Sequence, residues 1–312
     1  MSNVMTSNKN KKQLTSVGIV GCGWLGTPLA QHLKKQGVAV LATRSNTDNV
    51  KQLTNQGINA AVLSLPAQQT ALNNHPVFKQ QCLVIAITPQ FRQGRVDYAD
   101  KVAQLVTAAK NNNKVEKIIL LSSSAVYNGL SGLVDESMVL DLTADKVSVL
   151  NQAEQTVLNF TSDQVVKASN ADMLYVNGHS GLGRNKGFVL RLTGLVGPNR
   201  HPGKFLSHGR MLQNPQAQVN LIHQQDAVSL ILSLLASDIH GGIFNGVSAT
   251  QVTKKQYYQA AANALNLPPP SFEEKDSLSK TDSKIVSGKK TQEALHYAFV
   301  YDDLLAWLEQ GH

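Results

Sequence analysis

The stretch Ser16-Val-Gly-Ile-Val-Gly-Cys-Gly-Trp-Leu-Gly26 decides the fold class of this chain. Its first five residues form a short β-rich run, and the next six form a glycine-rich turn. Residues 27–36 follow with apolar side chains at helical spacing, Gly37 caps the helix, and residues 38–42 form the next strand. A strand, a glycine turn, a helix and a second strand in this order predict a dinucleotide-binding βαβ unit.

Strands and helices continue to alternate beyond this unit. The sequence predicts further strands at residues 60–65, 82–87 and 115–121, with a helix at 98–111. This rhythm is typical of an α/β protein of the Rossmann type, in which a doubly wound parallel sheet carries helices on both faces.

After residue 150 the pattern becomes irregular. A helix at 148–160 precedes a polar segment at 161–186 that resembles an insertion, and a strand follows at 188–192. We therefore expect a flexible tail at 1–13, a dinucleotide-binding domain over 14–195, and a smaller C-terminal substrate lobe mainly over 196–312. Part of 220–245 is expected to return to the first domain.

The glycine turn predicts where a cofactor binds. Gly21 permits the tight turn, Gly23 lets the backbone approach a pyrophosphate, and Gly26 lets the helix pack closely on the strand. The start of the helix adds N–H groups and the positive end of its dipole. A purely structural turn is the alternative. The predicted cofactor contacts are Gly21, Cys22, Gly23, Trp24, Leu25 and Gly26, together with Thr88 after a later strand.

The end of the second strand favours NADP(H) over NAD(H). NAD sites usually place an acidic residue there for the ribose 2′-hydroxyl. This chain has Ala42-Thr-Arg-Ser45 instead, with no acid before Asp48. Arg44 can bind a 2′-phosphate, and the hydroxyls of Thr43 and Ser45 can donate to it. An exposed arginine on a loop is the alternative interpretation.

Composition excludes several classes of protein. The 312 residues are 42% hydrophobic and 16% charged, which indicates a packed globular chain. No apolar stretch reaches the length of a membrane span, and the first residues lack the apolar core of a secretory signal. Two isolated cysteines favour a cytoplasmic protein with buried thiols. The net charge is +8, but the basic residues form no stripe with interleaved aromatic residues. We therefore expect the protein to bind an anionic small molecule and no nucleic acid. The histidines form no metal set.

Five further motifs carry a family resemblance. They are Leu121-Ser-Ser-Ser-Ala-Val-Tyr127, Asp135-Glu136, Arg191-Leu-Thr-Gly-Leu-Val-Gly-Pro198, Leu221-Ile-His-Gln-Gln-Asp-Ala-Val228 and Ile243-Phe-Asn245. In this order and spacing the chain resembles the extended short-chain dehydrogenase/reductases, the NAD(P)-dependent epimerase/dehydratase group. It looks most like their atypical branch, which has GxGxxG in place of GxxGxxG. The resemblance covers roughly residues 17–308.

The resemblance implies catalytic positions and one departure. Ser123 corresponds to the catalytic serine that hydrogen-bonds the substrate oxygen, with Ser122 nearer the cofactor and Ser124 toward the substrate. The family's YxxxK motif falls at Lys146 and Leu150. Its tyrosine acts as general acid/base with a pKa lowered by the lysine, a charge that Leu150 cannot supply. Lys146 is the candidate replacement for proton transfer; a solvated lysine at the start of a helix is the alternative.

The substrate side is predicted from the loop that follows the strand at 188–192. Arg200, His201 and Lys204 would give the cleft a cationic mouth for phosphate or carboxylate. The favoured function is an NADP(H)-dependent oxidoreductase of nucleotide-sugar epimerase/dehydratase type, acting on a small anionic or sugar-like substrate. A non-catalytic NADP(H)-binding redox sensor is the rival. The apolar face of the helix at 148–160 predicts either a homodimer contact or packing on the sheet.

Overall fold

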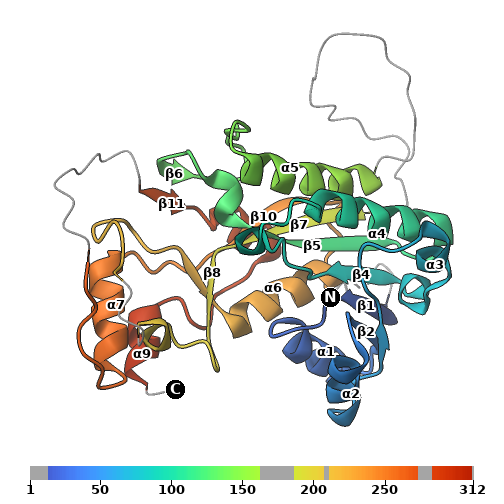
Figure 1. Ribbon diagram of the computed structural model, residues 1–312, viewed down its shortest axis with the longest axis horizontal. Helices are drawn as coiled ribbons and strands as arrows, with labels where there is room; N and C mark the ends of the chain where they lie inside the picture. Colours follow the sequence, from blue (N-terminus) through green and yellow to red (C-terminus); the bar gives the residue numbers. More distant parts are fainter. Residues whose placement is uncertain (1–12, 162–185, 207–210, 273–282, 311–312) are drawn as a thin grey trace, which may run out of the picture.

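A seven-stranded sheet forms the centre of the molecule in the computed structural model, which describes residues 13–161, 186–206, 211–272 and 283–310 (Figure 1). All neighbouring strands of this sheet run parallel. In spatial order they are β10 (Gly242–Gly246), β7 (Lys186–Leu192), β5 (Lys117–Ser123), β4 (Cys82–Ile85), β1 (Ser16–Val20), β2 (Ala39–Arg44) and β3 (Ala60–Val62).

Helices cover both faces of the sheet. In Figure 1, α4 (Tyr98–Asn112) and α5 (Asp145–Leu158) lie together on one face, and α1 (Gly26–Lys35) and α6 (Gln224–Ala236) lie on the other. The remaining helices are α2 (Thr47–Asn55), α3 (Gln69–Asn74), α7 (Lys254–Asn263), α8 (Lys289–Leu295) and α9 (Leu304–Glu309). The predicted α/β class with a doubly wound parallel sheet is confirmed.

Each face of the sheet has its own apolar core. On the α4 and α5 face, Leu150, Ala153 and Val157 of α5 are buried within the chain. The apolar face of α5 therefore packs onto its own molecule, one of the two arrangements that the sequence leaves open. On the other face, Leu29 of α1 and Ile231 of α6 belong to a second buried cluster.

A smaller lobe is built from two short parallel pairs, the C-terminal helices and their own apolar cluster. The pairs are β8 (Gly194–Val196) with β9 (Leu221–His223), and β6 (Gly132–Val134) with β11 (Lys284–Val286). In Figure 1 this lobe lies at the left, beyond the ends of the long central strands.

Asp226 ties the C-terminal segment to α6. Its buried carboxylate accepts hydrogen bonds from the Tyr297 hydroxyl and from the backbone N–H groups of Val300 and Tyr301. The neighbouring His223 ring packs against Tyr301, with ring centroids 3.8 Å apart. These contacts give His223 and Asp226 structural roles within the smaller lobe and α6.

Several sequence expectations concern residues beyond this description. All but one residue of the expected tail, and most of the polar segment at 161–186, lie outside the described residues.

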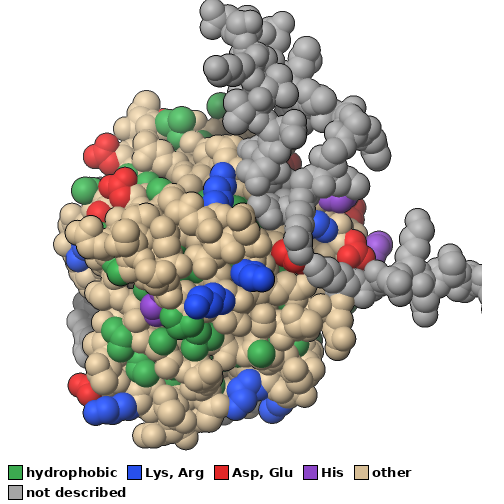
Figure 2. Space-filling model, turned by 90° about the vertical axis from the view of Figure 1, so that its right-hand side faces the viewer, with side chains coloured by type: hydrophobic (Ala, Val, Ile, Leu, Met, Phe, Trp, Pro, Cys, Tyr) green, Lys and Arg blue, Asp and Glu red, His purple; other side chains and the backbone are tan. Residues whose placement is uncertain are grey.

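Within the described part, no helix is long and apolar enough to cross a membrane. On the face drawn in Figure 2, the Lys and Arg side chains form small groups within largely neutral surface, and the carboxylates lie toward its left and right edges.

Candidate cofactor and active site

A cleft of about 710 Å³ opens at the carboxyl ends of the strands. The strand order reverses here, because β1 leads to β2 and β3 on one side while β4, β5 and β7 follow on the other. Doubly wound proteins bind ligands at this switch point. The volume lies in the range of small-molecule and cofactor sites.

The glycine turn forms one wall of the cleft. Gly21 has a φ of 84°, and a Cβ there would lie 3.0 Å from the carbonyl of Ala86, so a larger residue would be both strained and crowded. A Cβ on Gly23 would meet the Arg44 guanidinium at 3.2 Å and little else. The space above Gly23 therefore stays open to a ligand beside the start of α1, where the helix dipole favours an anion.

Arg44 lies against this turn. It ends β2, is half-buried, and its Nη1 donates to the Cys22 carbonyl oxygen at 2.9 Å. The exposed Ser45 lines the same part of the cleft. A guanidinium and a hydroxyl thus meet where the adenosine end of a dinucleotide is expected in this fold.

The side chains of Cys22 and Thr43 are buried behind the glycine turn and do not line the cleft. Because side chains alternate along a strand, Thr43 points inward from β2 while Arg44 faces the cleft. The Thr43 hydroxyl accepts from the Gly21 N–H at 3.3 Å, and its carbonyl accepts from the Cys22 N–H at 2.9 Å. Burial raises the pKa of the Cys22 thiol to about 11. The structure thus gives these two side chains a supporting position, where the sequence predicted cofactor contacts.

The other residues predicted for the cofactor line the cleft. They are Trp24, Leu25 and Gly26 of the turn, Thr88 after β4, and Ser122 at the end of β5. The structure thus brings together residues that lie up to one hundred positions apart in sequence. The end of β4 faces the glycine turn because β1 and β4 are neighbours in the sheet.

Ser122 and Ser123 end β5 with their side chains in different surroundings. Ser122 is buried, and its hydroxyl donates to Glu154 Oε1 at 2.5 Å. Ser123 is half-buried in the cleft lining, and its hydroxyl oxygen accepts from the Ala125 N–H at 3.1 Å. The Ser123 O–H group is thus placed to donate to a ligand oxygen.

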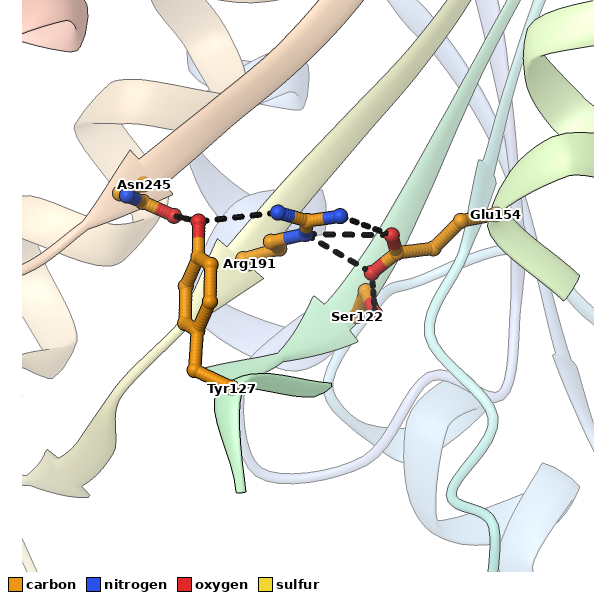
Figure 3. Close-up of polar contacts among 5 residues, drawn as sticks. All are labelled: Ser122, Tyr127, Glu154, Arg191 and Asn245. Atoms are coloured by element: carbon orange, nitrogen blue, oxygen red, sulfur yellow. Dashed lines mark hydrogen bonds and ion pairs between the residues drawn. The ribbon is translucent and has the colours of Figure 1, made fainter. Parts of the chain in front are cut away.

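A buried polar network supports Ser122 (Figure 3). Glu154 of α5 and Arg191 of β7 are almost fully buried, and Arg191 Nη2 lies 2.6 Å from Glu154 Oε2. Arg191 also donates to the Tyr127 hydroxyl at 2.9 Å, and this hydroxyl donates to Asn245 Oδ1 at 2.9 Å. The network joins β5, β7, β10 and α5 immediately behind the cleft.

The altered YxxxK positions lie on the first turns of α5. Leu150 is buried and lines the cleft, so an alkyl group occupies the position that the resemblance assigns to a lysine. Lys146 is exposed, and its Nζ lies 5.6 Å from the centre of the Phe91 ring. It does not belong to the cleft lining, and its role in proton transfer stays a prediction.

Arg200 reaches the cofactor side of the cleft. Its guanidinium lies 4.7 Å from the centre of the Trp24 ring, and the Trp24 Nε1 donates to the Pro198 carbonyl at 2.9 Å. Gln224 Nε2 donates to the Trp24 carbonyl at 2.8 Å. The loop predicted to bind substrate therefore contacts the glycine turn directly.

The other predicted substrate residues do not line this cleft. His201 is 3% exposed, packs against Trp307, and its Nδ1 accepts from the Gly203 N–H at the start of a short helix. Burial lowers the pKa of His201. Lys204 is exposed. Ser124, also predicted on the substrate side, accepts a hydrogen bond from Lys284 Nζ at its carbonyl oxygen, at 3.1 Å. Of the expected cationic mouth, the structure places Arg200 in the cleft.

Sequence reasoning missed one wall of the cleft, formed by Arg95, Tyr98 and Lys101. Asp97 binds both cations, with Arg95 Nη2 at 2.6 Å and Lys101 Nζ at 3.0 Å. The Arg95 hydrogen bond is the main reason that the pKa of Asp97 is lowered. The available signal was the charged first turn of a helix that follows β4, since such a turn borders the switch point.

Comparison with known proteins agrees with this site. Residues 16–128 match the family described as the NAD binding domain of 6-phosphogluconate dehydrogenase. Protein YeeZ of Escherichia coli K12 is 29% identical over 296 residues, which cover 94% of this chain and 98% of YeeZ. Within the described residues, no group of three potential metal ligands is found.

Two solved structures share the fold over nearly the whole chain. The UDP-N-acetylglucosamine 4-epimerase of Bacillus cereus is 17% identical with a TM-score of 0.71, covering 96% of this chain and 98% of the epimerase. The UDP-glucuronic acid 4-epimerase of the same species, solved with NAD, is 15% identical with a TM-score of 0.71, covering 95% and 96%. The chain thus shares the fold of these epimerases, and its first part is similar to an NAD-binding domain, in agreement with its resemblance to the extended short-chain dehydrogenase/reductases.

Proposed function

We propose that this protein is an NADP(H)-dependent oxidoreductase of nucleotide-sugar epimerase/dehydratase type that acts on a small anionic or sugar-like substrate. One observation carries the proposal. The same cleft has the glycine turn with Arg44 at one end and the Ser123 hydroxyl at the carboxyl end of β5. This arrangement fits a dinucleotide whose reactive end lies beside a hydrogen-bond donor for the substrate.

The described residues fit a bound NADPH. The open space above Gly23 can take the pyrophosphate, and Arg44 with Ser45 can take the 2′-phosphate. When bound, the nicotinamide would exchange a hydride with a substrate carbon. Ser123 then holds and polarises the oxygen on that carbon, and Arg200 offers a positive charge to an anionic substrate group or to the cofactor phosphates. Proton transfer at the oxygen falls to Lys146 or to water.

A specific observation supports a second function. Leu150 fills a buried position in the cleft where the resembling family has a cation, and Lys146 is exposed. General acid/base catalysis contributes about 10²–10⁴-fold in rate, so a chain without it can retain cofactor binding and lose turnover. A redox sensor that binds NADP(H) is therefore the alternative. The two UDP-sugar epimerases that share the fold favour the enzyme.

Titration with NADPH and NADH tests the cofactor assignment. We expect NADPH to bind at least about tenfold more tightly, because one charge-assisted bond contributes about 1.5–3 kcal/mol. Trp24 lies in the glycine turn, so its fluorescence should change on binding. A Trp307→Phe variant removes the buried tryptophan of the smaller lobe and serves as the control for the signal. Equal affinities would contradict the NADP(H) preference, and absence of binding would contradict the proposed function.

A further inference from the structure

Tyr98 has a buried hydroxyl group without a hydrogen-bond partner. The residue begins α4 and is 1% exposed. Among the described residues, four buried side-chain polar atoms lack a partner, and of these the Tyr98 hydroxyl belongs to a residue of the large cleft. An unpaired buried hydroxyl costs about 1–3 kcal/mol, so such a group at a binding site indicates that a ligand completes it.

The surroundings of Tyr98 identify its end of the cleft. Burial raises the pKa of Tyr98, and the negative charge of Glu154 raises it further. Glu154 in turn accepts the hydrogen bond of Ser122 at the end of β5. Tyr98 therefore lies within electrostatic reach of the β5 end and α5, and its raised pKa keeps the hydroxyl protonated and able to donate.

The opposite end of the cleft is already assigned to the other half of a dinucleotide. Arg44 and Ser45 lie at the carboxyl end of β2, and the glycine turn lies between them and β5. A dinucleotide with its 2′-phosphate on Arg44 and its pyrophosphate on the turn directs its nicotinamide half toward Ser122 and Leu150. That half carries ribose hydroxyls and a carboxamide oxygen, all of which accept hydrogen bonds. The alkyl side chain of Leu150 offers them none.

We propose that the Tyr98 hydroxyl donates a hydrogen bond to the nicotinamide half of the bound cofactor. Tyr98 is then a positioning residue, supplied by α4, at a site where α5 presents an alkyl group. This assignment rests on the proposed function, since it needs a dinucleotide in the cleft. It gives a role to one side chain of the wall formed by Arg95, Tyr98 and Lys101, which no sequence motif indicated.

Calorimetric titration of three proteins with two ligands tests the assignment. The ligands are NADPH and adenosine 2′,5′-bisphosphate, which lacks the nicotinamide half. The proteins are the wild type, Tyr98→Phe and Tyr257→Phe. Tyr257 is a matched control, because its hydroxyl is also buried and unpartnered but lies in the smaller lobe, away from the cleft.

We expect Tyr98→Phe to bind NADPH about 3- to 10-fold more weakly than the wild type, and to bind adenosine 2′,5′-bisphosphate equally well. Tyr257→Phe should match the wild type with both ligands. Both variants should melt at or above the wild-type temperature, since each loses a buried hydroxyl that has no partner in the fold.

Two results would overturn the assignment while leaving the proposed function intact. The first is wild-type affinity of Tyr98→Phe for NADPH. The second is equal weakening of both ligands, which would mean that the hydroxyl acts on the adenosine half or on the shape of the cleft. If the wild-type protein bound neither ligand, the proposed function would fail, and this assignment would fail with it.

Discussion

Replacing Arg191 with methionine is expected to lower the free energy of unfolding by about 3–5 kcal/mol, since this is the usual effect of removing one partner of a buried ion pair. The Glu154 side chain is 0% exposed, and it would lose both its charge partner and its bidentate hydrogen bonds. The Tyr127 hydroxyl would lose a donor as well. Urea unfolding followed by circular dichroism measures the change.

Two controls separate the loss of the pair from the loss of a side chain. The double variant Glu154→Leu/Arg191→Met removes both charges and should recover much of the stability, because apolar replacement of a whole buried pair is often neutral. Lys289→Met breaks an exposed pair with Glu293 and should change stability by at most about 1 kcal/mol. Equal effects of Arg191→Met and Lys289→Met would show that the buried pair does not stabilise the fold.

Arg44→Ala is expected to weaken NADPH binding by about 10- to 100-fold and to leave NADH binding within a few-fold of the wild type. The reason is the loss of one or more charge-assisted hydrogen bonds to the 2′-phosphate, each about 1.5–3 kcal/mol. NADH has a hydroxyl at that position, which gains far less from a cation. Calorimetric titration of both cofactors gives the two affinities directly.

Arg44 also has a structural contact that the experiment must separate. Its guanidinium donates to the Cys22 carbonyl, so its loss can loosen the glycine turn. A loosened turn would weaken NADPH and NADH equally, and this result would contradict the 2′-phosphate role. Arg44→Lys should retain part of the NADPH preference. Arg92→Ala, an exposed position outside the cleft lining, should change neither affinity.

The first part of the fold could be predicted because its signals are local. Gly21 and Gly23 act through backbone conformation and close approach, and both requirements appear in the turn that the sequence predicts. The position of Arg44 follows from the strand that it ends. Even here, α2 was not predicted. Thr43 was expected in the cleft, because a period of two along a strand fixes which side chains share a face but not which face is covered.

The remainder of the site depends on contacts between distant elements. Glu154 and Arg191 each interrupt an apolar pattern, and only the packing of α5 on β7 shows that they neutralise one another. In the sequence Tyr98 has no feature that distinguishes it from other helix residues. Its place at the switch point follows from the position of β4 in the sheet, since α4 begins after this strand. His201 was expected to bind substrate because it lies between two cationic residues in the sequence. In the structure the smaller lobe buries it against Trp307.

The contacts of Trp24 with Pro198, Arg200 and Gln224 make the glycine turn a shared boundary between the large sheet and the smaller lobe. A dinucleotide on this turn therefore changes the surroundings of the loop that would receive the second ligand. Thermodynamic linkage then requires that each ligand alter the affinity for the other by the same factor. Titrating either ligand in the presence and absence of the other would therefore measure one and the same coupling factor.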